Sequence, residues 1–143
     1  MNGFLIDTNV ISEFVKTDPN PAITLWFQAA PPDRLFASVV TFGKIGLGIE
    51  NMPKGKRRAD LENWLDKGLP GWFASNLLPV TKAIADQWAR ATIEAKRKGV
   101  NLTTADGLLA GTALEHGLTL VTRNTKDFSG LGVPLINPWS EQP

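Results

Sequence analysis

The sequence predicts an α/β domain with a mostly parallel central sheet flanked by helices. Short apolar runs typical of buried strands alternate along the chain with longer segments that carry helix start and stop signals. This alternation is typical of parallel sheets joined by helical crossovers. The chain has 143 residues, which is enough for one hydrophobic core and too few for two comfortable ones. We therefore expect residues 1–143 to form a single domain.

The first elements are a strand, two helix starts and a second strand. Phe4-Leu5-Ile6 is an apolar run that ends in Asp7-Thr8-Asn9, which predicts a buried strand followed by the start of a helix. A second helix is expected over residues 20–29, since Asn20-Pro21 provides a start and Pro31-Pro32 a stop. Residues 35–38 predict the second strand.

The middle of the chain predicts two helices, a third strand and a long helix. A helix is expected over residues 41–51, and the Pro53-Lys54-Gly55 turn leads into a helical stretch around 58–69. Residues 77–80 predict the third strand. Thr81 then starts a helix that runs to about residue 98.

The last third predicts a helix and two strands. Thr103-Thr104 starts a helix that Gly117 ends. Its small residues allow close packing against a neighbour: Gly107, Ala110, Gly111 and Ala113. Residues 118–122 form the clearest strand of the chain, and residues 133–136 predict a last short one.

Composition limits the classes of function. A formal net charge of +1 gives no global attraction to nucleic acid, so RNA binding would depend on local patches. The absence of cysteine excludes disulfides and thiolate metal sites and suits a reducing cytoplasm. A single histidine, His116, excludes a histidine-rich zinc centre.

The N-terminus lacks a signal sequence and no apolar run approaches the roughly 20 residues that a bilayer requires, so we expect a cytoplasmic protein with no membrane contact.

Acidic and amide side chains follow the predicted strands. Asp7 and Asn124 each lie just beyond a strand, and Asp106 opens a helix that can pack beside them. In parallel sheets, functional groups gather at the carboxyl ends of the strands. Clustered carboxylates repel one another unless a cation lies between them, and Mg²⁺ suits such oxygen ligands. Asp7 and Asp106 are therefore the candidate metal ligands, with Asn124 or Asp127 completing the site directly or through water.

Helix capping is the alternative explanation for the same acids. Asp7 can cap the helix that follows it, and Asp106 fits a capping box that begins at Thr103. The two explanations have about equal weight for these residues. Asp127 fits a similar device that begins at Asn124, and for Asp127 capping is the favoured interpretation.

Four ordered blocks of sequence resemble one protein family. Residues 4–13, 106–113 and 118–128 resemble the first, third and last motifs of PIN-domain toxins of the VapC and FitB-like type, and Asn137-Pro138-Trp139 resembles a common FitB-like ending. The likeness runs from residue 4 to residue 139 in the right order.

The resemblance implies a PIN fold, a three-layer α/β/α arrangement, and an Mg²⁺- or Mn²⁺-dependent endoribonuclease of a toxin–antitoxin module. It also implies a homodimer, an RNA substrate and a cognate antitoxin. Asp7 and Asp106 match the two principal metal ligands, and Thr8 and Asn9 match residues that support the first. Asn124 stands where some relatives have a fourth acid, and Asp127 is a nearby acid; both are counted as candidate catalytic residues.

One block departs from the family pattern. Residues 38–50 resemble the second motif, but Lys44 stands where the family has glutamate. With Asp7, Asp106 and Asp127, this replacement changes the formal charge of the site from −4 to −2. An ammonium cannot ligate a metal while it is charged, and it can pair with the remaining aspartates. Glu50 lies on a different face of the predicted helix and is a poor substitute. We expect Lys44 to weaken or abolish activity.

Two other classes of function remain open at this point. The first is a non-catalytic PIN-fold protein that binds an antitoxin or RNA, and Lys44 is the residue that favours it. The second is a haloacid-dehalogenase-like phosphatase, which also opens with a strand and an aspartate. That family requires a second aspartate where Asn9 stands.

Arg123, beside the acids, is a candidate phosphate ligand.

Overall fold

The computed structural model describes residues 3–141. Within this range, five parallel strands form one sheet in the order β3-β2-β1-β4-β5. The strands are short: β1 Phe4–Ile6, β2 Leu35–Ser38, β3 Leu77–Leu78, β4 Thr119–Val121 and β5 Leu135–Ile136. The central strand β1 pairs with β2 through Phe4 and Leu35, and with β4 through Ile6 and Val121. The predicted parallel sheet is confirmed.

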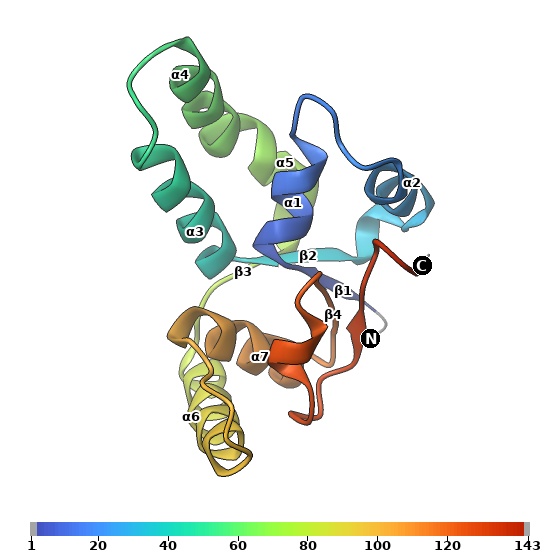
Figure 1. Cartoon of the computed structure of the whole chain (residues 1–143), viewed down its shortest axis with the longest axis vertical. Coiled ribbons are helices and arrows are strands. Elements are labelled where there is room, and N and C mark those ends of the chain that lie inside the picture. Colours follow the sequence, from blue (N-terminus) through green and yellow to red (C-terminus); the bar gives the residue numbers. More distant parts are fainter. Residues whose placement is uncertain (1–2, 142–143) are drawn as a thin grey trace.

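Helices cover both faces of this sheet, which gives three layers (Figure 1). One layer holds α1 Thr8–Phe14, α2 Pro21–Ala29, α3 Val39–Glu50, α4 Lys56–Asn63 and α5 Leu69–Phe73. The other layer holds α6 Lys82–Arg97 and α7 Thr104–His116. A π-helical turn, Trp64–Gly68, joins α4 to α5, and short 3₁₀ turns span Pro32–Arg34, Ala74–Asn76 and Thr125–Phe128.

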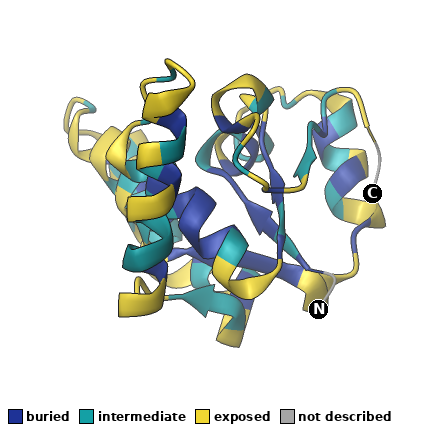
Figure 2. Ribbon diagram, turned by 90° about the horizontal axis from the view of Figure 1, so that it is seen from below, coloured by how far each residue is buried: buried dark blue, intermediate teal, exposed yellow. Residues whose placement is uncertain are grey.

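Alternate strand residues supply the two halves of the core. Ile6 and Val121 pack with α1, α2 and α3, whereas Leu5 and Leu120 pack with α6 and α7. Successive side chains of a strand point to opposite faces, so a three-residue strand buries apolar groups on both sides. Figure 2 shows buried residues concentrated in the strands and in the helix surfaces turned toward them.

The structure corrects several predicted boundaries. α3 begins at Val39 rather than Thr41, because the Ser38 hydroxyl accepts a hydrogen bond from the Val40 N–H (3.0 Å) and caps the helix there. The helical stretch predicted around 58–69 starts at Lys56 and continues through α5 to Phe73. Thr81 and Gly117 bound their helices as expected, and Gly117 adopts the left-handed conformation with φ 64°.

Between residues 3 and 141, no helix combines the length and the apolar character that crossing a bilayer requires.

Candidate functional site

Asp7 lies at the carboxyl end of the central strand and is fixed by three neighbours. Only 3% of its surface is exposed. Its Oδ1 accepts a hydrogen bond from the Thr8 N–H (2.6 Å), and its Oδ2 accepts one from the Thr122 hydroxyl (2.8 Å). The Asn9 amide lies 3.5 Å from the same Oδ2. Asp7 therefore caps α1, as one interpretation predicted, and also presents a buried carboxylate at the edge of the sheet.

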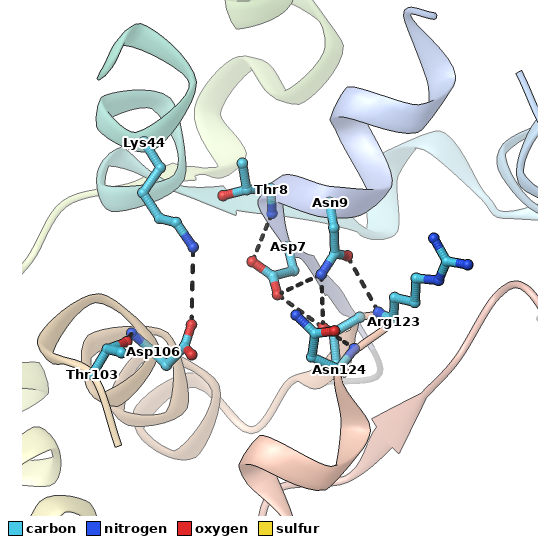
Figure 3. A network of polar contacts seen from close by, with 9 residues as sticks. Asp7, Thr8, Asn9, Lys44, Thr103, Asp106, Arg123 and Asn124 are labelled. Atoms are coloured by element: carbon cyan, nitrogen blue, oxygen red, sulfur yellow. Dashed lines mark hydrogen bonds and ion pairs between the residues drawn. The ribbon is translucent and has the colours of Figure 1, made fainter. Parts of the chain in front are cut away.

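Asp106 enters the same region from the first turn of α7. The Thr103 hydroxyl accepts a hydrogen bond from the Asp106 N–H (3.2 Å), so the first half of the expected capping box forms. The Asp106 carboxylate is turned toward Lys44 instead of back toward Thr103 (Figure 3). Burial raises the pKa of Asp106, the Lys44 charge opposes this rise, and the charges of Asp7 and Asp127 add to it. These influences place Asp106 within the electrostatic field of both other acids.

Lys44 projects from α3 toward Asp106. Its Nζ lies 3.9 Å from Asp106 Oδ1, and the two side chains are 38% and 19% exposed. The pairing of Lys44 with an aspartate is therefore confirmed. Glu50, at the end of α3, is held by the Arg58 guanidinium (2.9 Å) and does not replace an acid at position 44.

Asn124 and Asp127 follow β4 and lie at the exposed rim of the site. The Asn124 N–H donates to the Thr122 hydroxyl (3.1 Å), and the 3₁₀ turn after Asn124 carries no side-chain cap. The prediction that Asp127 belongs to a capping box is therefore wrong. In a capping box the Asp127 carboxylate would accept from the Asn124 N–H, but here the Thr122 hydroxyl accepts that hydrogen bond. Asp127 is close enough for its charge to raise the pKa of Asp106.

Thr122 is the site residue that the sequence analysis missed. It is fully buried, donates to Asp7, and accepts from both Asn9 Nδ2 (3.4 Å) and the Asn124 N–H. The available signal was its position directly after a strand and two residues before Asn124, at the edge where Asp7 was expected.

The donor set as it stands does not fit a divalent cation. Within residues 3–141, no three acidic, histidine or cysteine side chains converge closely enough to hold a metal ion. Asp7 and Asp106 offer carboxylates, but the ammonium of Lys44 lies against Asp106 and repels a second cation. The Lys44 ammonium partly neutralises this acidic pair.

A groove between α1, α3 and α4 reaches Thr8 and Lys44, the neighbours of Asp7 and Asp106. It encloses about 240 Å³. Its apolar lining includes Ile45, Ile49 and Trp64, and its polar lining includes the cations Lys44 and Arg57. An apolar floor with a basic lining is suited to a peptide or nucleic-acid segment that carries negative charge.

Comparisons with known proteins agree with this geometry. The family model of the PIN domain matches residues 4–133. VapC ribonuclease Y4jK from Sinorhizobium fredii is 36% identical over 135 residues, covering 94% of this chain and 96% of that protein. Toxin FitB from Neisseria gonorrhoeae is 33% identical over 137 residues, covering 96% and 99%.

Solved structures give the same result. The crystal structure of FitAcB from Neisseria gonorrhoeae superposes with a TM-score of 0.91 at 33% identity, covering 96% of this chain and 99% of that one. A toxin–antitoxin complex from Klebsiella pneumoniae superposes with a TM-score of 0.73 at 25% identity, covering 95% and 98%. These matches remove the case for a haloacid-dehalogenase-like phosphatase. The chain belongs to the PIN-domain family and, within it, to the toxins of the VapC and FitB-like type.

Proposed function

We propose that this protein is a PIN-type endoribonuclease toxin whose metal-dependent cleavage is weakened or abolished by Lys44. The ion pair between Lys44 and Asp106 is the observation that carries this proposal. The buried carboxylate of Asp7, after β1, and the partly buried carboxylate of Asp106, in α7, face one region, as a cation site requires. An ammonium occupies the position from which a third acid would act. We propose Mg²⁺ or Mn²⁺ for a version of the site with an acid at position 44.

The partners in this proposal are a cognate antitoxin, an RNA substrate and a second copy of the chain. The relatives support the first two: one is named a ribonuclease, another a toxin, and a third is solved as a toxin–antitoxin complex. The groove between α1, α3 and α4 supports a bound segment beside the acids. A cytoplasmic location and a single domain over residues 1–143 are parts of the same proposal.

The chemistry available to this chain follows from its own side chains. Asp7 is held in one orientation by Thr8 and Thr122, so its carboxylate needs little reorganisation to receive positive charge. Asp106 is partly desolvated, which strengthens its attraction for any cation nearby. With Lys44 beside it, that attraction is satisfied internally.

A non-catalytic binding protein is the second candidate function. The same Lys44–Asp106 pair favours it, because an internally neutralised site can keep its surface for an antitoxin or RNA without cleaving anything. The two candidates differ in one respect: only the first predicts that an acid at position 44 restores cleavage.

The test compares purified wild-type protein with Lys44→Glu and Lys44→Gln on a panel of structured RNAs, in Mn²⁺, Mg²⁺ or EDTA. We expect cleavage by Lys44→Glu alone, with loss of activity in EDTA. Lys44→Gln removes the positive charge without adding a ligand and serves as the first control. Lys82→Glu, on the exposed start of α6, makes the same charge change at a lysine that pairs with Asp86 rather than with an acid of the site.

Two results would count against this proposal. If a folded Lys44→Glu variant cleaves none of the RNAs, the result would favour the non-catalytic binding protein. Equal cleavage by wild type and Lys44→Glu would show that an acid at position 44 is dispensable.

A further inference from the structure

Arg123 is tied through its backbone to the residues that hold Asp7. Its N–H donates to Asn9 Oδ1 (3.2 Å), and the Asn9 amide nitrogen lies within 3.5 Å of Asp7 Oδ2 and 3.4 Å of Thr122 Oγ1. The position of residue 123 therefore follows that of the acidic centre.

The Arg123 side chain is held on an aromatic platform. Its guanidinium carbon lies over the ring of Trp139, 4.8 Å from the ring centroid. Trp139 is itself fixed, because its backbone N–H donates to Asn137 Oδ1 (2.9 Å) and its indole packs against the buried core. A guanidinium stacked in this way loses rotamer freedom before any ligand arrives.

Stacking leaves the hydrogen-bond donors of Arg123 available. The ring contact uses the face of the guanidinium, whereas its five N–H donors point outward in the plane. Across residues 3–141, no carboxylate lies within 4.0 Å of this guanidinium, and Arg123 is exposed. Glu13, whose pKa Arg123 helps to lower from a distance, is already bound by Lys16 (2.9 Å) and by the Asn20 N–H (2.9 Å). A structural ion pair therefore does not account for Arg123.

Lys44 and Arg123 lie on opposite sides of Asp7, and the guanidinium points away from the carboxylates (Figure 3). Arg123 therefore does not neutralise the acids, and it adds a local positive charge at the flank of a site whose carboxylates would otherwise repel phosphates. A planar guanidinium matches two oxygens of one phosphate, which a lysine cannot do.

We infer that Arg123, stacked on Trp139, binds a backbone phosphate of single-stranded RNA next to the phosphate that lies at Asp7 and Asp106. This inference rests on the proposed RNA-directed function and names a residue that positions the substrate. The stack makes the contact selective for arginine, and the link through Asn9 sets its distance from the acidic centre.

The test measures binding of a fluorescently labelled single-stranded RNA by anisotropy in EDTA, with the Lys44 protein as it exists, so that no cleavage interferes. We expect Arg123→Ala to weaken binding about tenfold at low salt. It should also flatten the slope of log K against log salt by about 0.7, the contribution of one phosphate on a single strand. Arg123→Lys should keep the slope and lose part of the affinity. Arg90→Ala, an exposed arginine on α6, should change neither quantity.

Two outcomes overturn the inference, and they are distinguishable. If wild type binds RNA and Arg123→Ala behaves like Arg90→Ala, Arg123 has no such role and the proposed function stands. If wild type binds no RNA at low salt, the inference and the RNA-binding part of the proposed function fail together. In the Lys44→Glu background, we expect Arg123→Ala to raise KM about tenfold and to leave kcat within about twofold.

Discussion

The Nζ atom of Lys44 lies 3.9 Å from Oδ1 of Asp106, although the two residues belong to helices in different layers of the fold. The pair spans the edge of the sheet at which Asp7 ends β1. Burial and repulsion from the charges of Asp7 and Asp127 both disfavour the ionised form of Asp106. The Lys44 ammonium is the contact that stabilises this ionised form. Under the proposed function, the same contact lowers the attraction of the site for a metal ion.

Asp106→Asn should raise the melting temperature at neutral pH in EDTA. Burial raises the pKa of Asp106 above 3.8, so the folded protein binds this proton more tightly than the unfolded chain does. The stabilisation from the protonated form is therefore complete below pH 3.8 and is lost as pH rises through the folded pKa. Asparagine is neutral throughout, so the difference in melting temperature should be small in acid and positive near pH 7.

The measurement is differential scanning calorimetry over this pH range, with Asp60→Asn on exposed α4 as the control. A surface change of this kind should alter stability by less than about 0.5 kcal/mol at any pH. A lower melting temperature for Asp106→Asn at neutral pH would show that the Lys44 pair outweighs the cost of burial.

Thr122→Val should lower the free energy of unfolding by about 1–3 kcal/mol, because it leaves the buried Asp7 Oδ2 without its closest donor. Thr112→Val is the matched control. Thr112 is also buried, but its hydroxyl donates only to the Leu108 carbonyl of its own helix, which keeps its backbone bond. Chemical denaturation of both variants tests this; equal effects would mean that the Thr122–Asp7 bond contributes nothing specific.

Gly111→Ala should destabilise the fold by about 1–3 kcal/mol through overpacking of α7 against α6. A Cβ at Gly111 would lie 2.8 Å from the Ile84 carbonyl oxygen and 3.0 Å from the Trp88 nitrogen, and backbone atoms cannot move aside cheaply. Gly48→Ala, in α3, meets nothing within 4 Å and should stabilise by about 0.5–1 kcal/mol. Thermal unfolding distinguishes the two, and a neutral Gly111→Ala would contradict the close approach of these helices.

The sequence predicts the order of elements well because local signals bound most of them. Thr81 caps α6 and Gly117 ends α7 in the left-handed conformation that glycine favours. The start of α3 could not be predicted in this way. Val39 and Val40 are β-branched and favour a strand locally, and only the Ser38 cap and the burial of Thr41, Ile45 and Ile49 make this segment helical.

The candidate site could be predicted in its acids but not in its hydrogen bonds. Asp7 and Asp106 follow recognisable local patterns. The role of Thr122 depends on the register that sets Ile6 beside Val121, which brings the ends of β1 and β4 together. Local sequence does not specify such a pairing, so the bond from Thr122 to Asp7 emerges only from the assembled sheet.

Mn²⁺ titration calorimetry without RNA tests most directly whether the Lys44 ammonium takes the place of a metal ion. We predict no measurable binding by wild type or Lys44→Gln, binding by Lys44→Glu, and loss of that binding when Asp106→Asn is added. Mn²⁺ binding by wild type as tight as that by Lys44→Glu would contradict this role of the ammonium.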